Sequence, residues 1–319
     1  MITLVTAFTY VAKIVHMDLK KILPVFLTCS ILIVPSCHNN KDRPETDISE
    51  DVDMMVDVTS RLEEMISSRK TIFYGIYSPV EMSAFFEQYQ IGFDPSVLHP
   101  VDRASQYVLT DKIALNIGIY GADLSYIKLF DQPQEAIHYY LTIGKLSRQL
   151  GIPVELIRAP ADDYLQNIDD PDKLVAIATT TYVATEQFLK RNDREHAAVL
   201  MLTGGWVEAM YIATHALYDP DRPQEEIIER IAAQKYSLNL LITMMQNHAH
   251  HESVARYLHL LNVLKKYFDQ FDIYFEKDDV TIDTASRSII SSRSYVDISA
   301  GIVENIKRVV AGIRYEITG

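Results

Sequence analysis

Apolar residues recur at helical spacing through most of this chain, and this pattern constrains its fold more than any other feature. Between Asp102 and Phe130 the apolar side chains fall three or four residues apart, as one face of a helix requires. Glycine and proline are scarce, at 11 and 12 of 319 residues, so few positions interrupt such helices. The pattern predicts an all-α fold, a multi-helix bundle of about nine helices.

Cap residues and first-turn prolines mark where the helices begin, as at Ser78-Pro79 and Asp170-Pro171. The expected helices span residues 79–90, 102–130, 133–151, 153–168, 171–190, 195–218, 221–247, 252–276 and 295–315. Residues 280–294, in which Thr and Ser cluster, are expected to be loop or irregular chain. No glycine-rich segment divides residues 55–319, which are therefore predicted to form a single globular domain.

The N-terminal region carries a different pattern. Lys20 and Lys21 precede the apolar run Ile22–Val34, which has the length of a signal-peptide core and is short for a membrane span. The small residue Ser36 then precedes Cys37. These residues resemble a bacterial lipoprotein signal. The resemblance implies cleavage before Cys37, a lipid on its thiol and a place in the bacterial cell envelope, anchored to a membrane.

Two other interpretations of this region stay open. Residues 1–36 could be an ordinary secretory signal followed by an unrelated cysteine. They could also be an uncleaved anchor, because Met1–His16 is fairly apolar too; a start at Met17 would instead give a compact signal peptide. Residues 37–54 are polar and acidic, and we expect them to form a flexible tether before the helical domain.

Charge and cysteine content exclude several functions. The chain has a formal net charge of -13 and no basic stripe, which argues against a nucleic-acid partner. Its two cysteines, Cys29 and Cys37, both precede the helical domain, so that domain has no disulfide framework, thiolate zinc site or cysteine nucleophile. Common catalytic and nucleotide-binding motifs are missing, so we expect no cofactor and favour a protein that is not an enzyme.

Two helices carry unusual polar and small residues. On the helix that contains residues 116–126, a stripe of small side chains would let a neighbouring backbone approach closely; it consists of Ala114, Gly118, Ala122 and Ser125. A second stripe on the same helix is polar and consists of Lys112, Asn116, Tyr120 and Asp123. On the very apolar helix 195–218, one face holds Gly204, Glu208, Tyr211 and His215.

These two helices allow two interpretations. The first is a buried hydrogen-bond network that fixes the register of the helices, since an unpaired buried carboxylate is costly. The second is a small-molecule pocket between the helices, with Asp123 and Glu208 as its acids and Tyr120, Trp206 and Tyr211 as its aromatic walls. Helix 195–218 has the length of a membrane span, but the polar Glu208 and His215 favour a buried core helix.

A histidine cluster follows helix 221–247. If its residues are helical, His248, His251 and Glu252 share a face, and His259 joins it two turns later. Imidazole and carboxylate groups commonly bind metal ions together, which makes this a candidate metal site. The competing interpretation is a polar helix junction, where histidine is favoured near a helix C-terminus.

The chain as a whole resembles the helical lipoproteins of the Bacteroidota in composition. We therefore predict a non-enzymatic envelope lipoprotein whose helical domain binds a small ligand or an envelope partner. The alternative is a structural or assembly subunit that docks another envelope protein through an exposed face.

Overall fold

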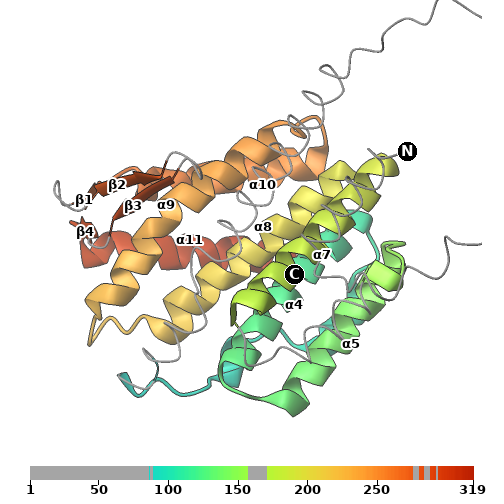
Figure 1. The fold of residues 1–319 in the computed structure, drawn as a ribbon, viewed down its shortest axis with the longest axis horizontal. Helices are drawn as coiled ribbons and strands as arrows, with labels where there is room; N and C mark the ends of the chain where they lie inside the picture. Colours follow the sequence, from blue (N-terminus) through green and yellow to red (C-terminus); the bar gives the residue numbers. More distant parts are fainter. Residues whose placement is uncertain (1–85, 87–88, 157–170, 276–279, 284–287, 292–293) are drawn as a thin grey trace, which may run out of the picture. The chain divides into compact units, whose positions relative to one another are not determined.

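Helix α8, Glu195–Ile212, runs through the centre of the helical domain (Figure 1). It continues into a π-helical turn, η5, at Ala213–Leu217. Among the described residues, the segment Glu195–Leu217 is the one helix long and apolar enough to cross a membrane, and 83% of its apolar window is buried inside the protein. That burial is typical of a core helix, because a lipid-facing helix would expose its apolar surface.

The computed structural model describes residue 86 and residues 89–156, 171–275, 280–283, 288–291 and 294–319. The chain divides into two units, Met1–Met54 and Met55–Gly319, and every described residue belongs to the second. The predicted signal peptide, Cys37 and the tether therefore lie outside the described residues. So do most of the helices expected at residues 79–90 and 153–168.

The helices around α8 confirm the predicted all-α class. Helix α4, Thr110–Leu129, makes the most extensive contact with α8, and α5, Pro133–Gln149, packs on α4. Helices α7 (Pro171–Arg191), α9 (Glu225–Gln246) and α11 (Ala300–Thr318) also contact α8. Helix α10, Glu252–Phe268, packs on α9 and α11. The described residues thus form a multi-helix bundle.

The helix expected at residues 102–130 is broken in the structure. Short 3-10 turns occupy Pro95–Val97 (η3) and Val101–Gln106 (η4), and α4 begins only at Thr110. Tyr107 and Leu109 have extended backbones, which leaves Val108 80% exposed. The break allows the Tyr107 hydroxyl to donate to the carbonyl of Thr318, a long-range contact that helical periodicity cannot predict.

The expectation for residues 252–296 is wrong at two places. Helix α10 ends at Phe268 rather than near residue 276, and β1 (Ile273–Phe275) pairs antiparallel with β4 (Ser294–Val296). The stretch expected to be loop holds β2 (Val280–Asp283) and β3 (Ser288–Ser291), which also pair antiparallel. Both pairs are rich in β-branched and aromatic residues, which favour strands. The clustered Thr and Ser of this segment instead suggested a loop.

The core lies where α4, α8 and α11 meet, and it contains polar groups among large apolar side chains. Tyr120, Tyr126 and Leu115 are among the largest fully buried side chains. Asn116, Asp123 and Glu208 are equally enclosed, each with no exposed surface. A buried polar group must find a partner, so these residues mark the place to look for a site.

Candidate functional site

Helices α4 and α8 approach each other through glycines, as the stripe of small residues predicted. A Cβ added to Gly118 would lie 2.0 Å from the carbonyl oxygen of Met201 and 2.5 Å from the amide nitrogen of Gly205. One added to Gly204 would lie 1.9 Å from the carbonyl oxygen of Leu115. The backbones are therefore too close for any side chain here, and this contact brings the polar faces of the two helices together.

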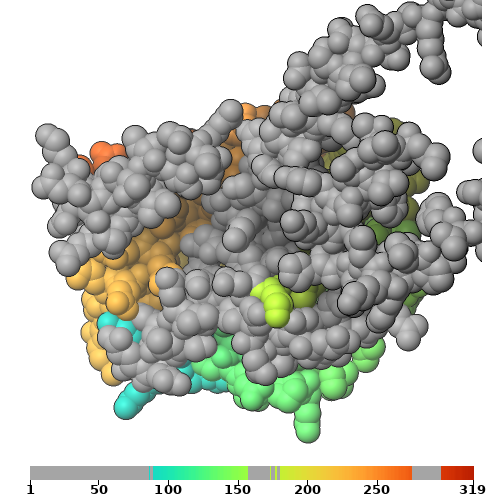
Figure 2. Space-filling view, viewed as in Figure 1, coloured from blue at the N-terminus to red at the C-terminus, as the bar shows by residue number. Residues whose placement is uncertain are grey.

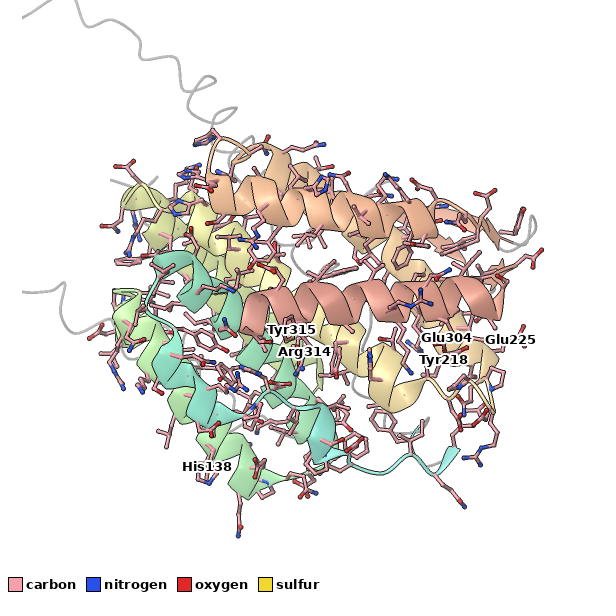
Figure 3. The ribbon with its side chains drawn as sticks, turned by 180° about the vertical axis from the view of Figure 1, so that it is seen from behind. His138, Tyr218, Glu225, Glu304, Arg314 and Tyr315 are labelled. Atoms are coloured by element: carbon pink, nitrogen blue, oxygen red, sulfur yellow. The ribbon has the colours of Figure 1, made fainter. Side chains whose placement is uncertain are left out.

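Asp123 of α4, Glu208 of α8 and Arg314 of α11 form the centre of the buried polar network. The Arg314 guanidinium donates from Nε to Glu208 Oε2 at 2.6 Å and from Nη2 to Oε1 at 2.7 Å. The same Nη2 donates to the carbonyl oxygen of Val97 at 2.9 Å. Arg314 lies near the C-terminal end of α11, as Figure 3 shows from behind. The bidentate pair thus joins α8 to α11 and to the segment before α4.

The two carboxyl groups are buried neighbours, and both have raised pKa values. Burial raises the pKa of Asp123 well above its ordinary value, and the neighbouring Glu208 carboxylate raises it further. Burial also raises the pKa of Glu208, although Arg314 and a hydrogen bond from Asp123 oppose this. Asp123 therefore stays protonated and donates to an ionised Glu208, whose charge Arg314 balances.

His99 and two tyrosines complete the surroundings of Asp123. The backbone N–H of His99 donates to Asp123 Oδ2 at 3.1 Å, and the Tyr139 hydroxyl donates to the carbonyl of His99 at 3.0 Å. The His99 ring nitrogen Nε2 lies 2.7 Å from the Tyr107 hydroxyl oxygen. Burial, followed by the charge of Arg314, lowers the pKa of His99 to about 3. His99 is therefore neutral, and Arg314 is the cation of this network.

Tyr120 and Tyr211 lie beside this network. The Tyr120 hydroxyl donates to the carbonyl of Pro100 at 3.0 Å, and its ring centroid lies 5.2 Å from that of His99. The Arg314 guanidinium carbon lies 4.0 Å from the centroid of the Tyr211 ring, a cation–π contact. His215 stacks on Tyr211 with ring centroids 4.0 Å apart, and burial lowers the pKa of His215.

Lys112 and Asn116 donate hydrogen bonds to the C-terminal carbonyls of α11. Lys112 Nζ donates to the carbonyls of Glu316 and Ile317 at 2.5 and 3.0 Å. Asn116 Nδ2 donates to the carbonyl of Lys112 at 2.9 Å and to that of Ile317 at 3.4 Å. The last carbonyls of a helix have no partner within it, so these side chains satisfy them and fix the end of α11.

Trp206 points to another part of the core. Its indole nitrogen donates to Ser237 Oγ of α9 at 2.9 Å, and Ser237 Oγ donates to Gln234 Oε1 at 2.6 Å. Trp206 and Glu208 are two positions apart on α8, so they face nearly opposite directions. The prediction that Trp206 forms a wall beside the carboxyl pair is therefore wrong.

The histidine cluster is a helix junction, not one helical face. His251 is the N-cap of α10, Glu252 is its first residue, and His248 lies in the turn before it. The His251 ring stacks on His196 of α8, with centroids 4.1 Å apart. Among the described residues, no group of three or more His, Cys, Asp or Glu is placed to hold a metal ion. The predicted set, which included His259, is thus not assembled as a metal site.

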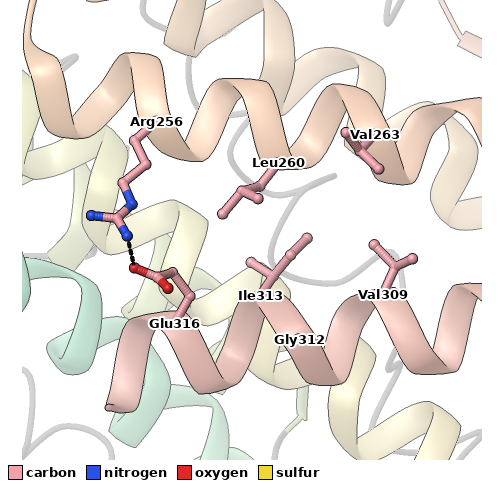
Figure 4. Close-up of a pocket in the computed structure, with 7 residues that line it drawn as sticks. All are labelled: Arg256, Leu260, Val263, Val309, Gly312, Ile313 and Glu316. Carbon is pink, nitrogen blue, oxygen red and sulfur yellow. Dashed lines mark ion pairs between the residues drawn. The ribbon is translucent and has the colours of Figure 1, made fainter.

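An open groove lies elsewhere, between α10 and α11, with a volume of about 370 Å³. Its apolar walls come from both helices, and an ion pair between Arg256 and Glu316 closes one end (Figure 4). The residues that line it are Arg256, Leu260, Val263, Val309, Gly312, Ile313 and Glu316. This groove is lined by none of the residues that the sequence predicted as site residues.

Sequence reasoning missed Arg314, the cation of the buried network. A usable signal was present: on α11 the buried apolar residues include Val310, Ile313 and Ile317, and Arg314 lies four residues after Val310 and three before Ile317. An arginine on an apolar stripe of a helix implies a buried anionic partner. His99 gave no comparable signal, because it lies in a loop.

Comparison with protein-family models, with curated proteins and with solved structures found no match for this chain. The functional argument therefore depends on the geometry of its own residues.

Proposed function

We propose that this protein is a non-enzymatic lipoprotein of the bacterial cell envelope, anchored through Cys37, whose helical domain binds a small ligand in the groove between α10 and α11. The groove is the observation that carries the binding proposal. Its volume of about 370 Å³ falls within the range of roughly 300–1,000 Å³ that is usual for small-molecule sites.

The buried carboxyl pair supports a binding protein rather than an enzyme. Asp123 and Glu208 have no exposed surface, Arg314 donates to both oxygens of Glu208, and the His99 N–H donates to Asp123 Oδ2. A substrate could reach them only if α4, α8 and α11 separated. The pair is therefore better explained as the network that holds these helices in register than as an acid–base catalyst.

The anchor can be tested with the two cysteines of the chain. Cells expressing the protein would be fed an alkyne-bearing fatty acid, and labelling and membrane association would be measured. We expect label on the wild type and on Cys29→Ala, and none on Cys37→Ala, which should leave the membrane fraction. Label that survives in Cys37→Ala would refute the anchor.

The binding proposal can be tested by native mass spectrometry of the protein purified from its host. We expect a bound ligand that disappears when the groove is filled by Gly312→Leu. Gly301→Leu adds the same side chain to α11 outside the groove, where the one atom near an added Cβ is Ser299 Oγ at 4.0 Å, and should keep the ligand. A bare chain mass for the wild type would contradict the proposal.

A second candidate function, a subunit that docks another envelope protein, is favoured by α5. Ile137 and Leu141 lie one turn apart on this helix and are 57% and 61% exposed. Helix α5 contributes to the molecular surface, green in Figure 2. The double variant Ile137→Glu/Leu141→Glu should keep its melting temperature but lose a partner protein from the native mass spectrum; an unchanged spectrum would count against docking through this face.

A further inference from the structure

We propose that the ligand of the α10–α11 groove is an amphiphile with a single unbranched alkyl chain and an anionic head group, with the chain lying over Gly312 and the head group at Arg256. This inference rests on the proposed function, since it specifies the ligand of that groove. Four features of the groove lead to it: its polarity, its size, the exposed arginine and the bare glycine.

The groove is polar at one end and apolar along the rest of its length. Leu260 and Val263 of α10 face Val309 and Ile313 of α11, while the Arg256–Glu316 ion pair lies at one end (Figure 4). A ligand that matches this surface must itself have one charged end and an apolar body. A polar metabolite would not cover the apolar walls, and a pure hydrocarbon would make no hydrogen bond to the remaining N–H donors of Arg256.

The size of the groove favours a thin chain over a docked helix. The lining residues of α10 run from Arg256 to Val263, seven residues further on, which is about 10 Å of helix. A single helical turn with its side chains is about 10–12 Å across and 5.4 Å long, on the order of 500 Å³. A helix could therefore place only part of its surface in this open groove of about 370 Å³, whereas a single alkyl chain is thin enough to lie along it.

Arg256 can receive an anionic head group without losing its present partner. Its side chain is 63% exposed, and its ion pair with Glu316 Oε1 uses the terminal nitrogen Nη2. A guanidinium has five N–H donors, so further donors remain for a carboxylate or phosphate oxygen. Glu316 is 36% exposed and competes for the same cation. Its charge therefore disfavours a dianionic head group close by.

Gly312 keeps the groove open at the surface of α11. Glycine inside a helix costs about 1 kcal/mol relative to alanine, and helix packing usually explains it. Here packing does not, because a Cβ added to Gly312 would meet nothing within 4 Å. This contrasts with Gly118 and Gly204, where neighbouring backbone leaves no room. Gly121 and Gly144 are equally free of neighbours, but Gly312 lines the groove, so a larger side chain there would extend into the space proposed for the ligand.

The test is photocrosslinking of the full-length protein in nanodiscs of neutral phosphatidylcholine. The probe is decanoate carrying a diazirine on its chain, and decanol with the same diazirine is the uncharged control. The yield of crosslinked peptides from α10 and α11 is measured by mass spectrometry. Because every variant is compared in the same membrane, partition of the probe into lipid cancels.

We expect decanoate to label residues of α10 and α11, and Gly312→Leu to lower this yield about tenfold or more, since each buried methylene changes affinity about fourfold. Gly301→Leu should label like the wild type, and Gly312→Ala should lower the yield less than Gly312→Leu does. Arg256→Gln should lower decanoate labelling about three- to fivefold, as removal of an exposed charge partner does, and leave decanol labelling unchanged. Arg222→Gln, which changes an arginine that is 86% exposed in a loop, is the matched control.

Equal yields in Gly312→Leu and the wild type, or equal responses of decanoate and decanol to Arg256→Gln, would overturn this proposal. Its failure can be told from that of the proposed function. A retained ligand that Gly312→Leu removes, but that has no alkyl chain or no anionic group, would leave the groove as the binding site and reject only the ligand class.

Discussion

Alanine in place of Gly118 or Gly204 tests the closest contact between helices described here. The added Cβ would lie 2.0 Å from Met201 O at position 118 and 1.9 Å from Leu115 O at position 204, whereas real Cβ atoms essentially never come within 3.0 Å of such neighbours. The obstructing atoms belong to helix backbone, so α4 and α8 must move apart by about 1 Å. A gap of about 0.5–1 Å forfeits a quarter to a half of the dispersion energy of each contact across it.

We therefore expect each variant to lose about 3 kcal/mol of unfolding free energy, the upper part of the range for overpacked cores. The double variant should lose less than the sum, because both changes separate the same pair of helices. Urea denaturation followed by the fluorescence of Trp206, which is buried on α8, measures this loss.

Two other glycines of the same helices provide matched controls. A Cβ at Gly121 of α4 would meet nothing within 4 Å, and one at Gly205 of α8 would lie 3.4 Å from the carbonyl oxygen of Gly118. Gly121→Ala should therefore stabilise the protein by about 0.5–1 kcal/mol through helix propensity, and Gly205→Ala should be near neutral. If Gly118→Ala costs no more than Gly121→Ala, the close backbone contact does not exist and the reasoning fails.

Four further predictions concern the buried network and the histidine cluster. Arg314→Met should cost about 3–5 kcal/mol in urea denaturation, because it leaves Glu208 buried without its cation. Since folding raises the pKa of Asp123, its contribution to stability is fully present below the ordinary value of about 4 and is lost as the pH rises through the folded-state pKa. Asp123→Asn should remove this fall in stability, and parallel pH curves for the two proteins would contradict it. Folding lowers the pKa of His99 to about 3, so stability should fall by at most about 1.4 kcal/mol per pH unit as the pH drops below about 6.5, and His99→Gln should abolish that fall. Zinc at micromolar concentration should leave the melting temperature unchanged, and a clear rise would restore the metal hypothesis for the histidine cluster.

The sequence could predict the fold class and the meeting of α4 with α8 because both depend on local spacing. Apolar periodicity locates helices one at a time. A glycine within an apolar helix allows another backbone to lie against it, and Gly118 and Gly204 are used in this way, whereas Gly121 is not. The acidic pair Asp123 and Glu208 could be placed together by the same argument, since each lies on the same helix as one of these glycines.

The pairings in the rest of the buried network could not be predicted because the partners come from distant parts of the chain. Arg314 lies 106 residues after Glu208, and Tyr107 lies 211 residues before its acceptor on Thr318. No spacing rule relates such positions. The break before α4 and the strand pair β1–β4 have the same origin, since contacts made only in the folded protein decide where these elements begin and end.

The buried network and the open groove share helix α11, so the closed polar core would hold the proposed binding surface in place. Arg314 is held inside by Glu208, and Lys112 fixes the carbonyls at the end of the helix. The groove wall at Gly312 and Ile313 is the next part of the same helix, so it is held in place before a ligand arrives. A preformed wall avoids the entropic cost of ordering on binding. Variants of Arg314 should consequently weaken the groove as well as the fold, whereas Gly312→Leu blocks the groove while leaving the Arg314–Glu208 pair intact.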